Sequence, residues 1–274
     1  MRIAAGIEYC GAGFSGWQSQ EQGRNVQDCL EAALASVADH PVKVHCAGRT
    51  DAGVHAMQQV VHFDTRAERE PHAWVLGGNV SLPRDVRILW ACTVEDSFHA
   101  RFSATGRQYR YLILNRIAAA AVYNGLVTWE CRHLDVARMQ EAARCLLGEH
   151  DFSAFRAVAC QAKSPVREVR QLEVRRHGDL IIIDVRANAF LYHMVRNIAG
   201  VLMAIGVGKE PVTWTRQVLE SRNRTAGGIT APADGLYLVD IEYPAAFGLP
   251  KQAVSQWLLH HAGAGCGMDR DLTV

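Results

Sequence analysis

Hydrophobic and polar positions follow the same series of periods twice along the chain. Period-two segments, which predict strands, cover residues 3–9, 43–47, 57–64, 87–94, 107–115, 168–176, 180–187 and 236–243. Helical periodicity covers residues 25–38, 71–80, 135–147 and 189–205. Each half therefore reads β-α-β-β-α-β. We predict an α+β fold in which two ferredoxin-like, or RRM-like, halves join into one mostly antiparallel sheet with flanking helices.

Capping and turn residues set the expected boundaries. Asn25 and Asp135 are placed as helix N-caps, and Gly148 follows the last helical position of the third predicted helix. His177-Gly178-Asp179 between two strand patterns predicts a hairpin. We expect an N-terminal half at residues 1–102, a C-terminal half at 103–247 and a mobile tail at 248–274.

The composition limits the class of protein. Hydrophobic residues make up 49% of the 274 and charged residues 21%, which is ordinary for a globular chain with a sizeable core. There is no apolar run of 18 residues, so we expect no membrane span. Eight cysteines without a C-x-x-C pair fit reduced thiols in a cytoplasmic protein. Twelve histidines show no metal-ligand spacing, so we expect no metal.

The net charge of +1 argues against a generic polybasic nucleic-acid binder, but it leaves room for a local basic groove. The basic residues are unevenly placed. Two segments concentrate them: Arg101, Arg107 and Arg110 in the first, and Lys163, Arg167, Arg170, Arg175 and Arg176 in the second. Solvated strand faces would explain either cluster equally well.

The candidate chemistry centres on one loop, residues 47–56, with the sequence AGRTDAGVHA. Its carboxylate, Asp51, lies between Gly48 and Gly53 and follows Arg49. Glycines at this spacing let the chain bend and let a ligand approach the main chain. A carboxylate held beside a cation on such a loop is a candidate nucleophile, although the same pattern is also typical of an ordinary turn.

Four stretches resemble one family, the pseudouridine synthases, and within it the TruA family of bacterial tRNA enzymes, and the resemblance extends in order over roughly residues 2–250. They are Tyr9-Cys10-Gly11 with Phe14-Ser15-Gly16-Trp17-Gln18, then Gly48 to Ala56, Phe98 to Thr105 with Arg107 to Tyr111, and Phe190 with His193 to Gly200. Their joint occurrence in this order is far more specific than any one of them.

The resemblance implies isomerisation of uridine to pseudouridine, without a cofactor, at positions 38, 39 and 40 of the tRNA anticodon stem-loop. It implies that Asp51 is the nucleophile, that Tyr109 stacks on the target base, and that Arg196 holds the catalytic carboxylate. It also implies a homodimer. To tRNA binding we assign Tyr109 and four basic side chains: Arg49, Arg101, Arg107 and Arg110.

The chemistry makes further expectations specific. A target base in a stem must be extruded from the stack, and an aromatic platform such as Tyr109 then restores part of the stacking. A pocket that excludes water raises the pKa of a carboxyl, and an opposed guanidinium lowers it again. We therefore predict a direct contact between Arg196 and Asp51, against the alternative that Arg196 pairs structurally with Asp184 or Glu168.

Other interpretations stay open from the sequence alone. Tyr109 could fill a core, Phe14 and Trp17 could form a core plug, and we expect a structural role for His55. A noncatalytic RNA-binding module would suit paired βαββαβ halves, but the RNP-type aromatic motif is absent. A nucleoside hydrolase would need a second carboxylate at a defined separation, and no second strong acidic motif occurs.

Overall fold

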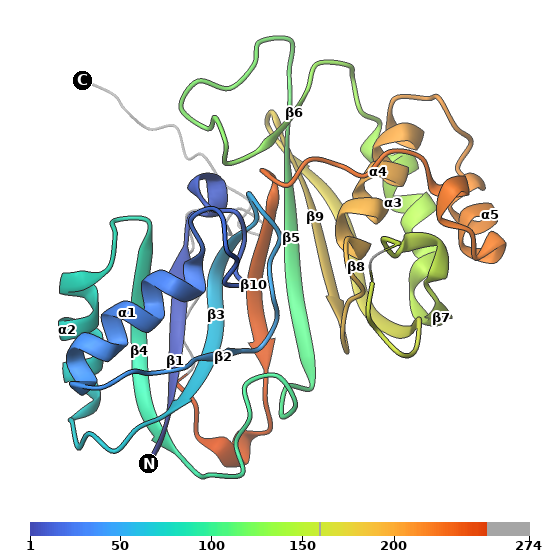
Figure 1. The fold of residues 1–274 in the computed structure, drawn as a ribbon. Coiled ribbons are helices and arrows are strands. Elements are labelled where there is room, and N and C mark those ends of the chain that lie inside the picture. Colours follow the sequence, from blue (N-terminus) through green and yellow to red (C-terminus); the bar gives the residue numbers. More distant parts are fainter. Residues whose placement is uncertain (159, 251–274) are drawn as a thin grey trace, which may run out of the picture.

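The computed structural model describes residues 1–158 and 160–250, which form one mixed, mostly antiparallel sheet of ten strands covered by helices (Figure 1). The strands are β1 (Arg2–Tyr9), β2 (His45–Cys46), β3 (His55–Asp64), β4 (Val86–Val94), β5 (Gly106–Asn115), β6 (Thr128–Glu130), β7 (Gly148–Asp151), β8 (Val166–His177), β9 (Leu180–Ala187) and β10 (Leu236–Glu242). The α-helices are α1 (Val26–Ala38), α2 (Pro71–Ser81), α3 (Val136–Ala143), α4 (Met194–Gly206) and α5 (Trp214–Ser221). None of the helices in these residues is long and apolar enough to cross a bilayer.

The strand order is β4-β1-β3-β10-β5-β9-β8-β7, with β2 paired to β3 and β6 paired to β5. Within the N-terminal part, the first and third strands are central, the fourth lies outside the first, and the second lies beside the third. The order β10-β5-β9-β8 repeats this arrangement in the C-terminal part. The duplicated hydrophobic pattern therefore corresponds to a duplicated strand order.

The two parts meet where β3 pairs with β10. This pairing is parallel and aligns Tyr237 with His55 and Leu238 with Ala56. The short strand β2 pairs with the far end of β3, where His45 aligns with His62. One edge of β3 is thus shared between β2 and β10, and the chain between β2 and β3 is left at the junction of the two parts.

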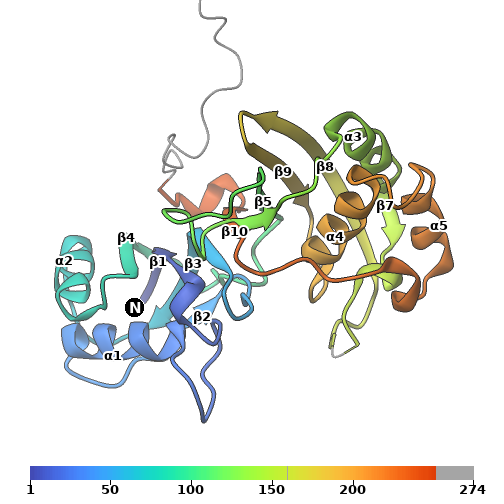
Figure 2. The ribbon, with the colours of Figure 1, turned by 90° about the horizontal axis from the view of Figure 1, so that it is seen from above.

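Separate helices and separate cores support the two parts. Figure 2 shows α1 and α2 on the N-terminal part and α3, α4 and α5 on the C-terminal part. One buried cluster is built around β1, β3 and α1, and another around β5, β8, β9 and α4. Tyr109 on β5 packs against both clusters. Its position between the two cores places it at the centre of the sheet.

Several boundaries differ from the sequence-based predictions. The strand expected at 43–47 is reduced to two residues. The helix expected from 189 begins at Met194, because His193 adopts the left-handed conformation with φ 61°. Asp135 caps α3 as predicted, accepting from the Arg138 amide at 3.1 Å. Asn25 stands at the N-cap of α1, but its amide donates to Asp28 instead of capping the helix.

Of the α-helices and strands, α5, β6 and β7 were not predicted at all. Each is short, and a strand of three or four residues gives too few positions for its period to be recognised. Of the predicted tail, residues 251–274 lie outside the part of the chain that the structure describes.

Candidate active site

The Asp51 loop is held by backbone contacts from several directions. The Trp17 amide donates to the Thr50 carbonyl at 3.0 Å, and the Gly53 amide donates to the Phe14 carbonyl at 3.4 Å. The Tyr9 hydroxyl and the Thr50 hydroxyl are 2.7 Å apart. Phe14 and Trp17 are both buried, so they form the plug on which the loop lies. A loop fixed in this way presents its carboxylate in a defined direction.

Two glycines of the first motif, Gly11 and Gly16, allow its backbone to approach the Asp51 loop closely. A Cβ on Gly11 would lie 2.0 Å from the Val54 carbonyl oxygen, which no side chain can tolerate. Gly16 has φ +111°, and a Cβ there would lie 3.0 Å from the Thr50 carbonyl oxygen. The first motif, Tyr9 to Gln18, therefore supports the second by letting two backbones touch.

His55 has the structural role expected for it. Its ring is buried and stacks on Tyr237 with the ring centroids 4.5 Å apart. Nδ1 accepts from the Gly11 amide at 3.0 Å, and Nε2 lies 3.1 Å from the Asp234 carbonyl oxygen. Burial lowers the pKa of His55, so the neutral ring donates from Nε2. The ring links the loop to the segment before β10.

Arg196 lies in the first turn of α4 and contacts Asp51. Its Nη1 donates to Asp51 Oδ2 at 3.4 Å, across 145 positions of sequence. Its Nε donates to the Ala231 carbonyl at 2.8 Å, which fixes the direction of the guanidinium. The predicted contact between Arg196 and Asp51 is confirmed. The alternative partners are occupied elsewhere, because Asp184 pairs with Arg110 and Glu168 pairs with Arg170.

His193 is a neighbour of Asp51 that the sequence analysis did not single out. Its Nε2 lies 3.3 Å from Asp51 Oδ2, and both side chains are about one fifth to one quarter exposed. Burial lowers its pKa, and the charges of Arg196 and Arg224 lower it further, whereas Asp51 raises it. His193 belongs to the fourth motif, three positions before Arg196, but the left-handed backbone that directs it toward Asp51 is not visible in the sequence.

Tyr109 lies half-buried on β5 next to the Asp51 loop. A Cβ on Gly48 would lie 4.0 Å from the Tyr109 hydroxyl oxygen, so the phenol reaches the loop. Its ring meets Phe190 edge to face, with the centroids 5.0 Å apart. Burial and the charge of Asp51 raise its pKa, which keeps the hydroxyl protonated. The structure thus brings Asp51, Arg196 and Tyr109 to one place.

The predicted tRNA-binding arginines fall into two groups. Arg49 and Arg101 are exposed, and within residues 1–158 and 160–250 neither guanidinium makes an ion pair. Arg101 lies over the Phe102 ring, 5.7 Å from its centroid. Both remain candidates for phosphate contacts, since an accessible guanidinium can bind a phosphate with two hydrogen bonds.

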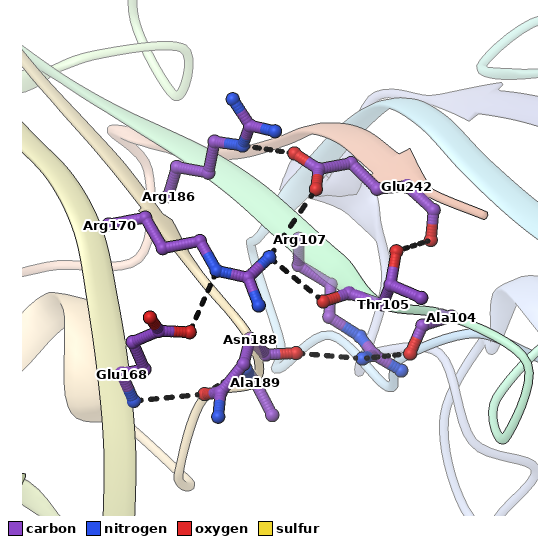
Figure 3. Close-up of polar contacts among 9 residues, drawn as sticks. All are labelled: Ala104, Thr105, Arg107, Glu168, Arg170, Arg186, Asn188, Ala189 and Glu242. Carbon is purple, nitrogen blue, oxygen red and sulfur yellow. Dashed lines mark hydrogen bonds and ion pairs between the residues drawn. The ribbon is translucent and has the colours of Figure 1, made fainter. Parts of the chain in front are cut away.

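Arg107 is directed into the protein, as Figure 3 shows for part of its contacts. Its Nη1 donates to the Asn188 carbonyl at 3.1 Å, and its Nη2 donates to the carbonyls of Ala47 at 3.2 Å and Arg101 at 2.9 Å. Burial lowers its pKa. These contacts connect the approach to the Asp51 loop with β5 and the end of β9, so the geometry favours a structural role over a phosphate contact.

Arg110 points to the other face of β5. It is buried and pairs with Asp184 through two hydrogen bonds of 2.7 and 2.9 Å. In Figure 3, Arg170 lies between Glu168 at 2.9 Å and Glu242 at 3.6 Å. A buried guanidinium that already has a carboxylate partner gains little from a phosphate. The geometry therefore argues against phosphate binding by Arg110, and in the second cluster Arg170 already has two carboxylate partners.

The arrangement can perform carboxylate chemistry next to an aromatic platform. Asp51 is a carboxylate, Arg196 is a fixed positive charge beside it, and the protonated Tyr109 has a flat face and a hydroxyl donor, a set of groups that can support nucleophilic or general-base chemistry. Across the described ranges no group of three or more histidine, cysteine, aspartate or glutamate side chains is placed to hold a metal ion.

Comparison with known proteins gives consistent matches. A family model described as tRNA pseudouridine synthase matches residues 5–103 and 142–244. The chain is 61% identical to tRNA pseudouridine synthase A of Nitrosococcus oceani, over 94% of this chain and all of that protein. It is 58% identical to the protein of the same name from Alcanivorax borkumensis, over 94% and 97% of the two chains. It is 52% identical to the protein of the same name from Vibrio cholerae, over 94% of this chain and 98% of that protein.

A solved structure, of a Cbf5-Nop10-Gar1 complex, is similar with a TM-score of 0.33 and 12% identity, over 73% of this chain and 44% of that chain. A likeness at this level carries no weight for function.

Proposed function

The chain belongs to the tRNA pseudouridine synthase family, and from that premise we propose that it isomerises uridine to pseudouridine at positions 38, 39 and 40 of the tRNA anticodon stem-loop. The enzyme is an isomerase. The observation that carries the assignment to this site is the contact between Asp51 and Arg196, because it joins the second and fourth family motifs in one place.

The reaction needs what the site offers. The bond between C1′ of the ribose and N1 of uracil breaks, and a bond between C1′ and C5 forms. The proton on C5 is released, and N1 gains one, so the product is an isomer and no redox cofactor takes part. A carboxylate can attack the sugar or the base, or accept a proton. In our proposal this group is Asp51.

Arg196 and Tyr109 would support Asp51 in different ways. The planar guanidinium of Arg196 stays charged when buried and orients the carboxylate. A uridine extruded from the stem loses its stacking partners, and a ring at the position of Tyr109 compensates by about 1–3 kcal/mol. Tyr109 packs against both cores, but its hydroxyl reaches the Asp51 loop at Gly48, and this position favours the stacking role over that of core filler.

We propose tRNA as the partner, held in part by phosphate contacts from Arg49 and Arg101. Such contacts position the anticodon arm without reading its sequence. We further propose that residues 1–102 and 103–247 are two ferredoxin-like units. The repeated strand order supports this division. A homodimer in the cytoplasm is our expectation from the family.

One assay tests the proposal. Unmodified tRNA carrying tritium at C5 of uridine is incubated with the purified protein, and released tritium is measured. Release of tritium, together with chemical tagging of pseudouridine in the anticodon arm, is the expected result. Release of free uracil would instead indicate a hydrolase, and binding without release would indicate an RNA-binding module.

Salt dependence tests the partner separately. Each phosphate that Arg49 and Arg101 neutralise releases condensed counterions, so tRNA affinity should fall steeply as salt rises. The slope of log affinity against log salt should decrease by about one when either arginine is replaced by alanine. An affinity independent of salt would contradict phosphate contacts as the basis of binding.

A further inference from the structure

Asp51 has two basic neighbours, and the role of the second is open. We propose that His193 is a positioning residue that donates from Nε2 to Asp51 Oδ2 and, together with Arg196, leaves Oδ1 as the reacting oxygen. This inference rests on the proposed function, because it assigns a task to His193 in the same reaction.

The first argument is that both neighbours converge on one atom. Arg196 Nη1 is 3.4 Å and His193 Nε2 is 3.3 Å from Asp51 Oδ2. Among the residues that the structure describes, Oδ1 of Asp51 has no ion-pair or side-chain hydrogen-bond partner. The Arg196 contact is a long hydrogen bond, and the His193 contact is a close approach without hydrogen-bond geometry; contacts of this kind often tighten only when the substrate is bound. One carboxylate oxygen is therefore held while the other stays available.

The second argument is the backbone of His193. Three non-glycine residues in the described ranges have positive φ: Asp39, His193 and Arg222. Asp39 and Arg222 are at helix C-caps, where the left-handed conformation is usual. His193 instead occupies the N-cap of α4 with φ 61° and ψ 6°, although an N-cap residue normally has extended geometry. Capping therefore does not explain this strained conformation.

The third argument is what the ring does not do. The His193 side chain makes no capping hydrogen bond to α4. Its ring lies against Tyr192, with centroids 4.0 Å apart and an angle of 35° between the planes. The left-handed backbone and the neighbouring ring together direct the imidazole toward Asp51. Backbone strain of this kind is retained where a side chain must be placed for function.

The protonation state fits a donor. The charged groups that face His193 are Asp51 from the loop, Arg196 from α4 and Arg224 from the segment after α5. Burial and the two arginines keep the pKa of the ring below its ordinary value, so the ring is neutral at pH 7. A neutral imidazole donates one hydrogen bond from Nε2 without adding a second positive charge that would weaken the carboxylate as a nucleophile or base.

The decisive variant is His193→Gly, because glycine adopts the left-handed conformation freely. It relieves the backbone and removes the donor. We expect an unchanged or higher unfolding temperature, unchanged tRNA affinity, and a single-turnover rate about 10- to 100-fold below wild type, which corresponds to one hydrogen bond to a charged group. His193→Gln, which restores an N–H donor, should recover part of the rate. His72→Gln on the exposed face of α2 is the matched control and should behave as wild type.

A pH profile separates positioning from a merely structural role. As the pH falls through its lowered pKa, His193 becomes charged and pairs more strongly with Asp51, so the wild-type single-turnover rate should decline. The glutamine variant has no such group and should lose this part of the decline.

The outcomes are distinct. If wild type releases no tritium, the proposed function fails. If wild type is active and His193→Gly matches its rate, or if the glutamine variant keeps the full acid decline, the inference about His193 is overturned.

Discussion

The two halves have the same strand order but use the connection between their second and third strands differently. In the C-terminal half, β8 has 12 residues and joins β9 through a tight turn at Gly178 and Asp179. In the N-terminal half, β2 has two residues, and residues 47–54 form the loop that carries Asp51. The same place in the fold is a closed hairpin in one half and the candidate active-site loop in the other.

The difference shows how a repeated fold makes room for a site. Because β2 is short, the edge of β3 at His55 and Ala56 remains open, and β10 pairs there. A full-length β2 would occupy this edge and would shorten the loop. The shortening therefore joins the two halves and frees the Asp51 loop at the same time.

The second helices differ as well. The α2 helix starts from the extended residue Glu70 with Pro71 at its first position, an ordinary beginning. The α4 helix starts from the left-handed His193 and directs Arg196 across the junction. In our proposal each half contributes one irregular feature, a loop from the first and a strained helix start from the second.

The largest effect should come from the loop. Asp51→Asn should lower the single-turnover rate by about 10³-fold or more, since an amide is close in shape but is a poor nucleophile and base. The affinity for tRNA should stay near wild type, because binding depends on contacts elsewhere. Rates come from tritium release, and affinity from filter binding.

Asp179→Asn in the equivalent turn of the C-terminal half is the matched control. Asp179 is mostly exposed, 3.7 Å from Arg116, and its replacement should change the rate by less than about twofold. Equal rates for both asparagine variants would remove Asp51 from the mechanism and erase the functional difference between the two connections.

Arg196, in the first turn of α4, should give the next largest effect on the rate. Arg196→Ala should reduce the rate by about 10²- to 10³-fold with tRNA binding retained, because the carboxylate loses its fixed charged donor. Arg196→Lys should lie between, since lysine keeps the charge but not the planar fork. Arg216→Ala on α5, where the side chain is 65% exposed, serves as control. Normal turnover by Arg196→Ala would show that its contact with Asp51 is only structural.

Tyr109 tests the junction between the halves. Tyr109→Leu should weaken productive binding by the stacking contribution of about 1–3 kcal/mol, whereas Tyr109→Phe should keep the platform and bind as wild type. Tyr111→Phe provides the contrast. It removes a buried hydroxyl that lies 2.6 Å from Thr128, so it should lower the free energy of unfolding but not the affinity. Wild-type rates for both Tyr109 variants would make this residue core filler.

The smallest effect concerns acid stability of the N-terminal half. The rings of His45, His62 and His99 cluster there, and burial together with the other two histidines lowers the pKa of His62 to about 4. In the unfolded chain His62 takes up a proton at about pH 6.5, whereas in the folded protein it does so only near pH 4. The free energy of unfolding is therefore highest above pH 6.5 and declines as the pH falls toward 4. The decline should be about 1–3 kcal/mol in denaturant titrations and smaller in His62→Gln. An identical decline in both proteins would show that His62 does not contribute.

Periodicity is a local signal, and it predicted most of the long strands and helices and a mostly antiparallel sheet. The contact between Asp51 and Arg196 was predicted through the resemblance that the ordered motifs carry. The sequence did not predict His193, since a left-handed helix start depends on packing that one sequence does not reveal. The tRNA-binding role predicted for Arg110 also went beyond what the alternation of the strand could support. Strand alternation put Arg110 opposite Tyr109, but only the register of β5 and β9 shows that Asp184 lies directly beside it.

The position of β10 determines how late during synthesis the sheet can be completed. It is the last strand along the chain, yet it lies between β3 and β5 in the middle of the sheet (Figure 1). A nascent chain on the ribosome can form the early units first, because domains fold as they emerge. The two halves cannot be joined until residues 236–242 have left the exit tunnel. Asp51 and Arg196 therefore meet only after nearly all of the described chain has been synthesised, and partial translation products contain the Asp51 carboxylate without its partner.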